Sequence, residues 1–189
     1  AWNSTGSITD YWWDFDAETP SDSIGTARDD RDAVGVNVSH VYDTSLVYTV
    51  YLRVTDGVNT STAQTDIHVD LIQEYEGQLI QRTDGSRNYT FDVTDSIKAK
   101  DLEVWIRYPS GSSGLNNLTL YLWDPDGELV ETSADDPRDS GTYQEEVIEL
   151  ESRYLAREPS GKWSVEVRYI FSPAMTTSID FDLTISVYY

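Results

Sequence analysis

The chain has 189 residues, enough for one large domain or two small domains with cores of their own. It has 34 acidic residues and only 13 lysines and arginines. The resulting net charge of -21 disfavours nucleic acids and anionic membranes as partners. The absence of cysteine excludes thiol catalysis and cysteine-ligated metal centres, whereas 39% apolar and 12% aromatic residues are too many for a disordered acidic tail.

The first half of the chain carries apolar residues with a period of two, which predicts β-strands. Residues 45–56 read SLVYTVYLRVTD, and every second residue from Leu46 to Val54 is apolar or tyrosine. Asp56-Gly57 is a hairpin-type turn signal, so residues 60–69 are expected to return as the next strand. The segment 70–76 is interpreted as the link to the second half, because one alternating run ends there.

The second half repeats this pattern in short strands separated by turn clusters rich in Gly, Pro, Asp and Ser. Strands are predicted at 89–93, 102–106, 118–122, 163–169 and 181–187. Residues 144–156 have helical propensity, but the β-branched Val147 and Ile148 favour a strand at 145–150. The predicted fold class is all-β, with two tandem antiparallel β-sandwiches at residues 1–72 and 73–189.

Three motifs of the first half occur in order as Tyr11-Trp12-Trp13-Asp14-Phe15-Asp16, His40-Val41-Tyr42 and the alternating strand from Tyr48 to Asp56. This combination resembles the PKD domain, an immunoglobulin-like module of secreted and surface proteins. The family's Gly-Asp-Gly turn is replaced here by Asp16-Ala17-Glu18, which predicts a longer acidic loop running to about Asp32. The family's opening strand or strands have no counterpart before Asn3, so we expect a strand from upstream sequence or a neighbouring subunit to complete the sandwich.

The second half resembles the pre-peptidase C-terminal (PPC) domain of bacterial and archaeal secreted proteins, a jelly-roll-like sandwich. The resemblance rests on the segments YTFDV at 89–93, LTLYLWDPDG at 118–127 and GKWSVEV at 161–167, together with the closing strand at 181–189. Proprotein-convertase P domains have a similar outline.

Calcium is the cofactor that the acidic loops favour, because it binds hard oxygen ligands held by loops between strands. The PKD resemblance implies a calcium site made by Asn3, Ser4, Asp14 and Asp16. A second candidate metal site is the loop with Asp135, Asp136 and Asp139. The alternative for both is a solvated acidic loop without a bound ion.

Five of the six asparagines begin an Asn-x-Ser/Thr triplet, which predicts N-glycosylation and hence an extracellular or cell-surface location. They are Asn3, Asn37, Asn59, Asn88 and Asn117. The alternative is that asparagine before Ser or Thr reflects turn chemistry. The 22 aspartates and only three lysines are typical of a salt-loving organism, or else of an ordinary acidic extracellular protein neutralised by calcium.

No catalytic motif is present, and the chain is predicted not to be an enzyme. We expect His40 to pack near a strand start, and His68 lies in a strand without a metal-ligand spacing partner. Four tryptophans are predicted in the core, and Trp2 and Trp12 are the pair predicted to be exposed. The four are Trp13, Trp105, Trp123 and Trp163.

The favoured function is a structural or adhesion module of a cell-surface, S-layer-like or filament protein, from a halophilic archaeon. Its expected partners are other copies or surface proteins, bound through β-edge or sandwich contacts, and no transmembrane segment is expected. Two alternatives stay open. One is the accessory region of a secreted hydrolase such as a protease, and the other is a carbohydrate-binding module with polysaccharide as its partner.

Overall fold

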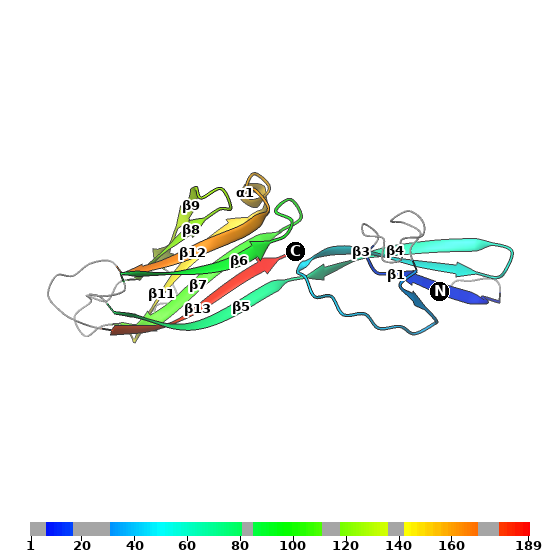
Figure 1. Ribbon diagram of the computed structural model, residues 1–189, viewed down its shortest axis with the longest axis horizontal. Coiled ribbons are helices and arrows are strands. Elements are labelled where there is room, and N and C mark those ends of the chain that lie inside the picture. Colours follow the sequence, from blue (N-terminus) through cyan, green and yellow to red (C-terminus); the bar gives the residue numbers. More distant parts are fainter. Residues whose placement is uncertain (1–6, 17–30, 81–84, 111–117, 136–141, 170–177) are drawn as a thin grey trace. The chain divides into compact units, whose positions relative to one another are not determined.

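A computed structural model describes residues 7–16, 31–80, 85–110, 118–135, 142–169 and 178–189. The chain divides into two compact units, Ala1–Val69 and Asp70–Tyr189 (Figure 1). Within these ranges the chain forms three antiparallel sheets, which confirms the all-β class. No helix in the described ranges is long and apolar enough to cross a membrane.

Unit 1 presents one four-stranded sheet within its described residues, in the order β2-β1-β3-β4. The strands are β1 (Asp10–Asp14), β2 (Ala33–Val34), β3 (Leu46–Thr55) and β4 (Thr60–Val69). The hairpin predicted at Asp56-Gly57 joins β3 to β4, and Gly57 takes a φ of 88° there. The Asp56 carboxylate accepts the Val58 and Asn59 amides at 2.9 and 2.6 Å, which stabilises the turn.

The described part of unit 2 forms two sheets. One has the order β10-β11-β7-β13-β5 and the other β6-β12-β8-β9. The strands of the first are β5 (Leu71–Ile80), β7 (Asp101–Pro109), β10 (Ala134–Asp135), β11 (Tyr143–Glu151) and β13 (Ser178–Tyr188). The strands of the second are β6 (Ser86–Val93), β8 (Leu118–Trp123), β9 (Leu129–Thr132) and β12 (Gly161–Tyr169). A single turn of helix, α1 (Ser152–Leu155), follows β11, so the strand predicted at 145–150 is confirmed.

The core of unit 2 lies between its two sheets. Alternate residues of each strand point inward, as the period of two requires. In β7, for example, Leu102, Val104 and Ile106 are all fully buried. Trp163 of β12 is also fully buried, and its indole N–H donates to the Pro159 carbonyl at 3.1 Å. This unit therefore buries most of the apolar side chains that the sequence alternation singled out.

The structure changes one feature of the predicted organisation. The segment 70–76, expected to be a link, belongs mostly to β5. The boundary between the compact units in the sequence therefore falls after Val69 rather than after residue 72. The hydrophobic alternation in β5 is weak because its inward positions include Gln73 and Gly77 and its outward ones include Ile72. Asp70 itself is held in unit 2, since its carboxylate accepts the Tyr189 amide at 2.9 Å.

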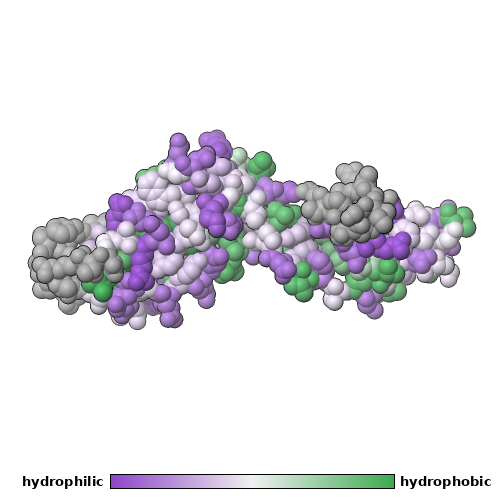
Figure 2. Space-filling model, in the orientation of Figure 1, coloured by the Kyte–Doolittle hydropathy of each residue, from purple (hydrophilic) through white to green (hydrophobic). Residues whose placement is uncertain are grey.

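The surface is largely hydrophilic on the face drawn in Figure 2, where hydrophobic residues form separate groups. In unit 1 the exposed apolar side chains include Val34, Val36 and Val41. Among the described residues, Phe15 and Val50 are the buried apolar side chains of unit 1. Unit 1 thus has a much smaller described core than unit 2.

Candidate functional site

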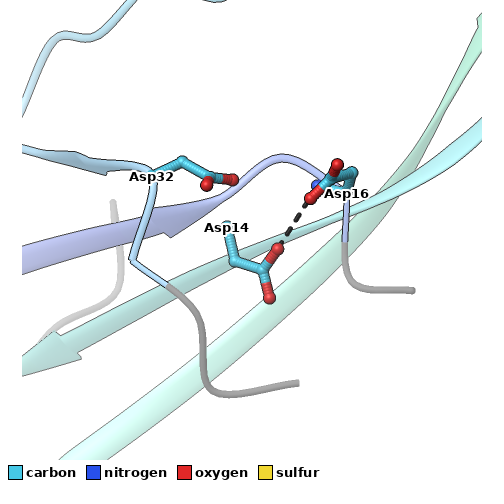
Figure 3. Close-up of side chains that lie close together, drawn as sticks. All are labelled: Asp14, Asp16 and Asp32. Carbon is cyan, nitrogen blue, oxygen red and sulfur yellow. Dashed lines mark hydrogen bonds between the residues drawn. The ribbon is translucent and has the colours of Figure 1, made fainter. Parts of the chain in front are cut away.

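Three aspartates come together at one end of β1. One oxygen each of Asp14, Asp16 and Asp32 lies within 4.8 Å of the others (Figure 3). Asp14 is 4% exposed, and the other two are partly buried. Within the described residues, this is the acidic grouping whose geometry suits a metal ion.

Strand pairing places these carboxylates. Asp14 ends β1, and Asp16 follows two residues later at a turn, where its amide donates to Asp14 Oδ1 at 3.2 Å. Asp32 directly precedes β2, and its amide donates to the Trp13 carbonyl at 2.9 Å. The Asp32 Oδ2 atom accepts the Phe15 amide at 2.6 Å, which ties the far end of the acidic loop back to β1.

An aromatic row borders the cluster. Phe15 stacks on His40 at 4.5 Å between ring centroids, and His40 meets the edge of Tyr42 at the same distance. The Tyr42 hydroxyl donates to the Phe15 carbonyl at 3.2 Å. Burial, chiefly, raises the pKa of Tyr42, and the charges of Tyr48, Asp16 and Asp32 add to that shift. The phenol therefore stays neutral and keeps donating beside the carboxylates.

The donor set fits a hard divalent cation. Carboxylate oxygens are the ligands that calcium prefers, and a loop offers the flexible geometry that calcium accepts. Three like charges at this spacing repel one another, more strongly where water is excluded around Asp14. A cation held by Asp14, Asp16 and Asp32 would offset that repulsion.

The predicted calcium ligands are only partly described. Asp14 and Asp16 lie together as expected, whereas Asn3 and Ser4 lie outside the described residues. Asp32 was not predicted as a ligand, because the sequence gives no sign of the two-residue strand β2 that brings it to Asp14. Of the second candidate loop, Asp135 lies in β10 opposite Glu146, and Asp136 and Asp139 are outside the described residues.

The described glycosylation candidates are all exposed. Asn37 lies just after β2, Asn59 in the turn before β4, and Asn88 in β6. Each neighbouring strand stands at the edge of its described sheet. Asn3 and Asn117 lie outside the described residues.

Trp163 alone of the four predicted core tryptophans is fully buried. Trp13, Trp105 and Trp123 are half-buried. Trp105 and Trp123 alternate with buried neighbours and so stand on outer sheet faces, which corrects the prediction. Period-two alternation indicates that a residue lies in a strand, but for a tryptophan it does not decide whether the side chain is on the core face or the outer face of the sheet.

Trp12, predicted to be exposed, is also half-buried. The Arg31 guanidinium lies over its ring, 4.2 Å from the centroid. Trp2 lies outside the described residues. His40 packs against Phe15 near β3, and His68 lies in the exposed strand β4.

Comparison with solved structures finds similar chains at low identity. A structure titled for the promiscuous specificity of carbohydrate-binding modules from the β-sandwich superfamily is 14% identical with a TM-score of 0.35, covering 98% of this chain and 85% of that one. The Gx strain of infectious bursal disease virus gives 13% and 0.42, covering 98% and 53%. The VP2 subviral particle of that virus gives 10% and 0.40, covering 98% and 53%. This chain thus spans about half of each viral chain, and similarity at this level carries no functional argument.

Comparison with curated proteins finds no match. The family model described as PKD domain matches residues 1–69, which are the extent of unit 1. That match agrees with the motifs around Trp13, His40 and Tyr48 and with their arrangement on one sheet and its aromatic row. Residues 1–69 are a PKD domain, followed in the chain by a second all-β unit.

Proposed function

We propose that this chain is a non-catalytic structural or adhesion module of an extracellular, N-glycosylated cell-surface protein of the S-layer or filament type, from a halophilic archaeon. The PKD domain and the all-β architecture support a binding or structural module. The charge of -21 and the five sequons support the salt-exposed surface location. The PPC resemblance of unit 2 remains a prediction within this proposal.

The observation that carries the proposal is the incomplete cover of sheet β2-β1-β3-β4. On the inward face of β3, Val50 is buried but Leu46, Tyr48, Leu52 and Val54 are only half-buried, whereas the inward residues of β7 in unit 2 are fully buried. An immunoglobulin-like sandwich buries this face under a second sheet. Unit 1 therefore offers an apolar surface on which further β-strands can pack.

The edge of the same sheet supports this reading. Strand β4 is the last strand in the described sheet, and nine of its ten residues are exposed. It contains no Pro or Lys, the residues that commonly protect an edge, and its one carboxylate, Asp66, accepts the Thr49 hydroxyl at 3.0 Å. On so acidic a chain, this weakly charged edge is where another strand meets little repulsion. Strand addition at β4 is our proposed mode of assembly.

Calcium would stiffen the same unit in this proposal. A cation held by Asp14, Asp16 and Asp32 would tie the end of β1 to the start of β2. These residues would supply the oxygen ligands, and the role of the ion would be structural.

Sedimentation of the full chain at several protein concentrations and salt levels tests assembly. We expect association that strengthens with salt, because screening reduces the repulsion between polyanions. Thr62→Lys with Gln64→Lys in β4 should abolish association. Val58→Lys is the matched control, because Val58 is 90% exposed in the adjoining turn rather than in the strand. A wild-type chain that stays monomeric throughout would contradict assembly through β4.

Mass spectrometry of the protein from its native cells tests the surface location. We expect glycans on the exposed Asn37, Asn59 and Asn88 and recovery in the cell-envelope fraction. Unmodified protein recovered from the cytoplasm would refute the extracellular part of the proposal.

A further inference from the structure

The outer face of the five-stranded sheet in unit 2 contains an open groove. Two hollows of about 490 and 610 Å³ share Glu76 and Asp182 in their lining. The larger lies on this face, and the smaller continues from it to Arg87 of β6 in the other sheet. Strands β5, β13 and β7 supply most of the lining. The groove belongs entirely to unit 2 and is independent of the proposed assembly surface at β4.

Strand register explains how this groove is lined. Trp105 of β7 is opposite Thr184 of β13, which is opposite Glu74 of β5. The next row along the strands is Arg107, Asp182 and Glu76. Residues directly opposite one another in antiparallel strands share a face, so both rows point outward together.

The floor combines an aromatic ring with polar groups on either side. Trp105 is half-buried, so it presents part of its indole to the larger hollow while its position is held by packing. Thr184 contributes a hydroxyl beside it, and Glu74, Glu76 and Asp182 contribute carboxylates. A ring flanked by hydrogen-bonding groups suits a ligand with a flat apolar face and a polar rim.

Arg107 supplies donors in the second hollow and is fixed in place. Its guanidinium lies 4.0 Å from the centroid of the Tyr143 ring, and its Nε is 3.5 Å from Glu145 Oε1. The Arg107 side chain nevertheless remains 40% exposed. The groove thus offers acceptors near Trp105 and donors one row further along.

The lining disfavours an acidic ligand. It carries the carboxylates of Glu74, Glu76, Asp180 and Asp182 against the guanidinium groups of Arg87 and Arg107, and Arg107 already has Glu145 at 3.5 Å. Hydroxyl groups both donate and accept, so an uncharged sugar can satisfy both sets of groups.

We propose that this groove binds an uncharged polysaccharide of β-1,4-linked pyranoses, glucose or N-acetylglucosamine, with one ring stacked on Trp105 and its hydroxyls bonded to Asp182, Glu74 and Thr184. Equatorial substituents leave such rings with the flat C–H face that stacking on indole requires. The site differs from the Trp2–Trp12 pair that the sequence predicted to be exposed. It adds a ligand to a module whose proposed role is structural.

Calorimetry of the full chain tests this site with cellohexaose and N-acetylchitohexaose as probes. Binding of at least one probe is expected, with Trp105→Ala weakening it at least tenfold and Asp182→Asn several-fold. Trp123→Ala is the matched control, since Trp123 is a half-buried tryptophan on the outer face of the other sheet, and it should leave affinity within twofold. Circular dichroism spectra and melting curves verify that each variant is folded.

Three results would each overturn the proposal. The first is the absence of binding by both neutral probes at millimolar concentration. The second is an equal loss in Trp105→Ala and Trp123→Ala. The third is a preference for hexa-arginine or hexagalacturonate over the neutral sugars, which would identify the groove as a site for a charged partner. None of these results depends on whether β4 mediates assembly, so the two proposals fail separately.

Discussion

Gly77→Ala is expected to destabilise unit 2 because the methyl group has no room. Gly77 lies in β5 directly opposite Phe181, on the face that points into the core. A Cβ at this position would lie 2.6 Å from Phe181 Cε2 and 2.7 Å from Tyr89 Oη. Unstrained contacts between carbon atoms need about 3.5–4.0 Å, so the Phe181 ring must move by roughly 1 Å.

The size of the effect follows from how tightly that ring is held. Phe181 is 3% exposed and meets Tyr89 edge to face at 6.3 Å, so moving it disturbs a second aromatic side chain. Overpacking of this kind costs about 1–3 kcal/mol. For a unit of this length the loss corresponds to a melting temperature lower by roughly 3–5 °C per kcal/mol.

Thermal unfolding followed by far-UV circular dichroism, with native-state hydrogen exchange at β5 and β13, measures this loss. Gly85→Ala is the matched control, because a Cβ at this position would have nothing within 4 Å of it. Phe181→Leu in the Gly77→Ala background should recover part of the stability, since leucine lacks the ring atoms that collide. If Gly77→Ala is as stable as Gly85→Ala, the packing argument is wrong.

Three further perturbations test other parts of the structure. Tyr189→Phe removes the hydroxyl that accepts the Thr94 amide at 2.8 Å, and urea unfolding should show a loss of about 1–3 kcal/mol; an unchanged midpoint would mean that water replaces the hydroxyl. Calcium should raise the melting temperature of unit 1 and Asp32→Asn should remove that increase, whereas an equal increase in both proteins would place calcium elsewhere. Hydrogen bonds from the Asn59 and Val58 amides lower the pKa of Asp56. The stability that this carboxylate contributes is therefore present above the pKa it has in the unfolded chain, and it is lost as the pH falls through the lower pKa of the folded state. An ordinary pKa for Asp56 in an NMR titration would refute this turn geometry.

Much of the fold is predictable because strands with one buried face repeat every two residues. The alternation in Leu46–Val54 predicted β3, and Asp56-Gly57 predicted the turn after it. Strand β5 was missed because its inward residues include Gly77, whose missing side chain makes room for Phe181. In β5 the hydrophobic pattern is therefore interrupted at the position where the Phe181 ring packs closely against the backbone.

The candidate metal site was half predictable for a similar reason. Asp14 and Asp16 lie within a recognisable motif, so their proximity follows from the local sequence. Asp32 joins them through the pairing of Trp13 with Ala33, a contact between distant segments that local sequence does not specify. Likewise, the alternation around Trp105 predicts a strand, but the order of strands in the sheet decides its neighbours. Because β13 pairs with β7, Thr184 lies opposite Trp105 and Asp182 lies opposite Arg107.

The sequence by itself determined that this is an acidic, cysteine-free, all-β chain whose first 69 residues carry the PKD motifs. These properties depend on composition and on neighbours along the chain, where charge, turn chemistry and a period of two act directly. Only the tertiary structure decided that Asp32 completes an acidic cluster, that β4 is an exposed edge, and that Trp105 forms the floor of a groove. Those outcomes depend on which strands pair and which face is covered, and such choices are made by packing between segments far apart in the chain.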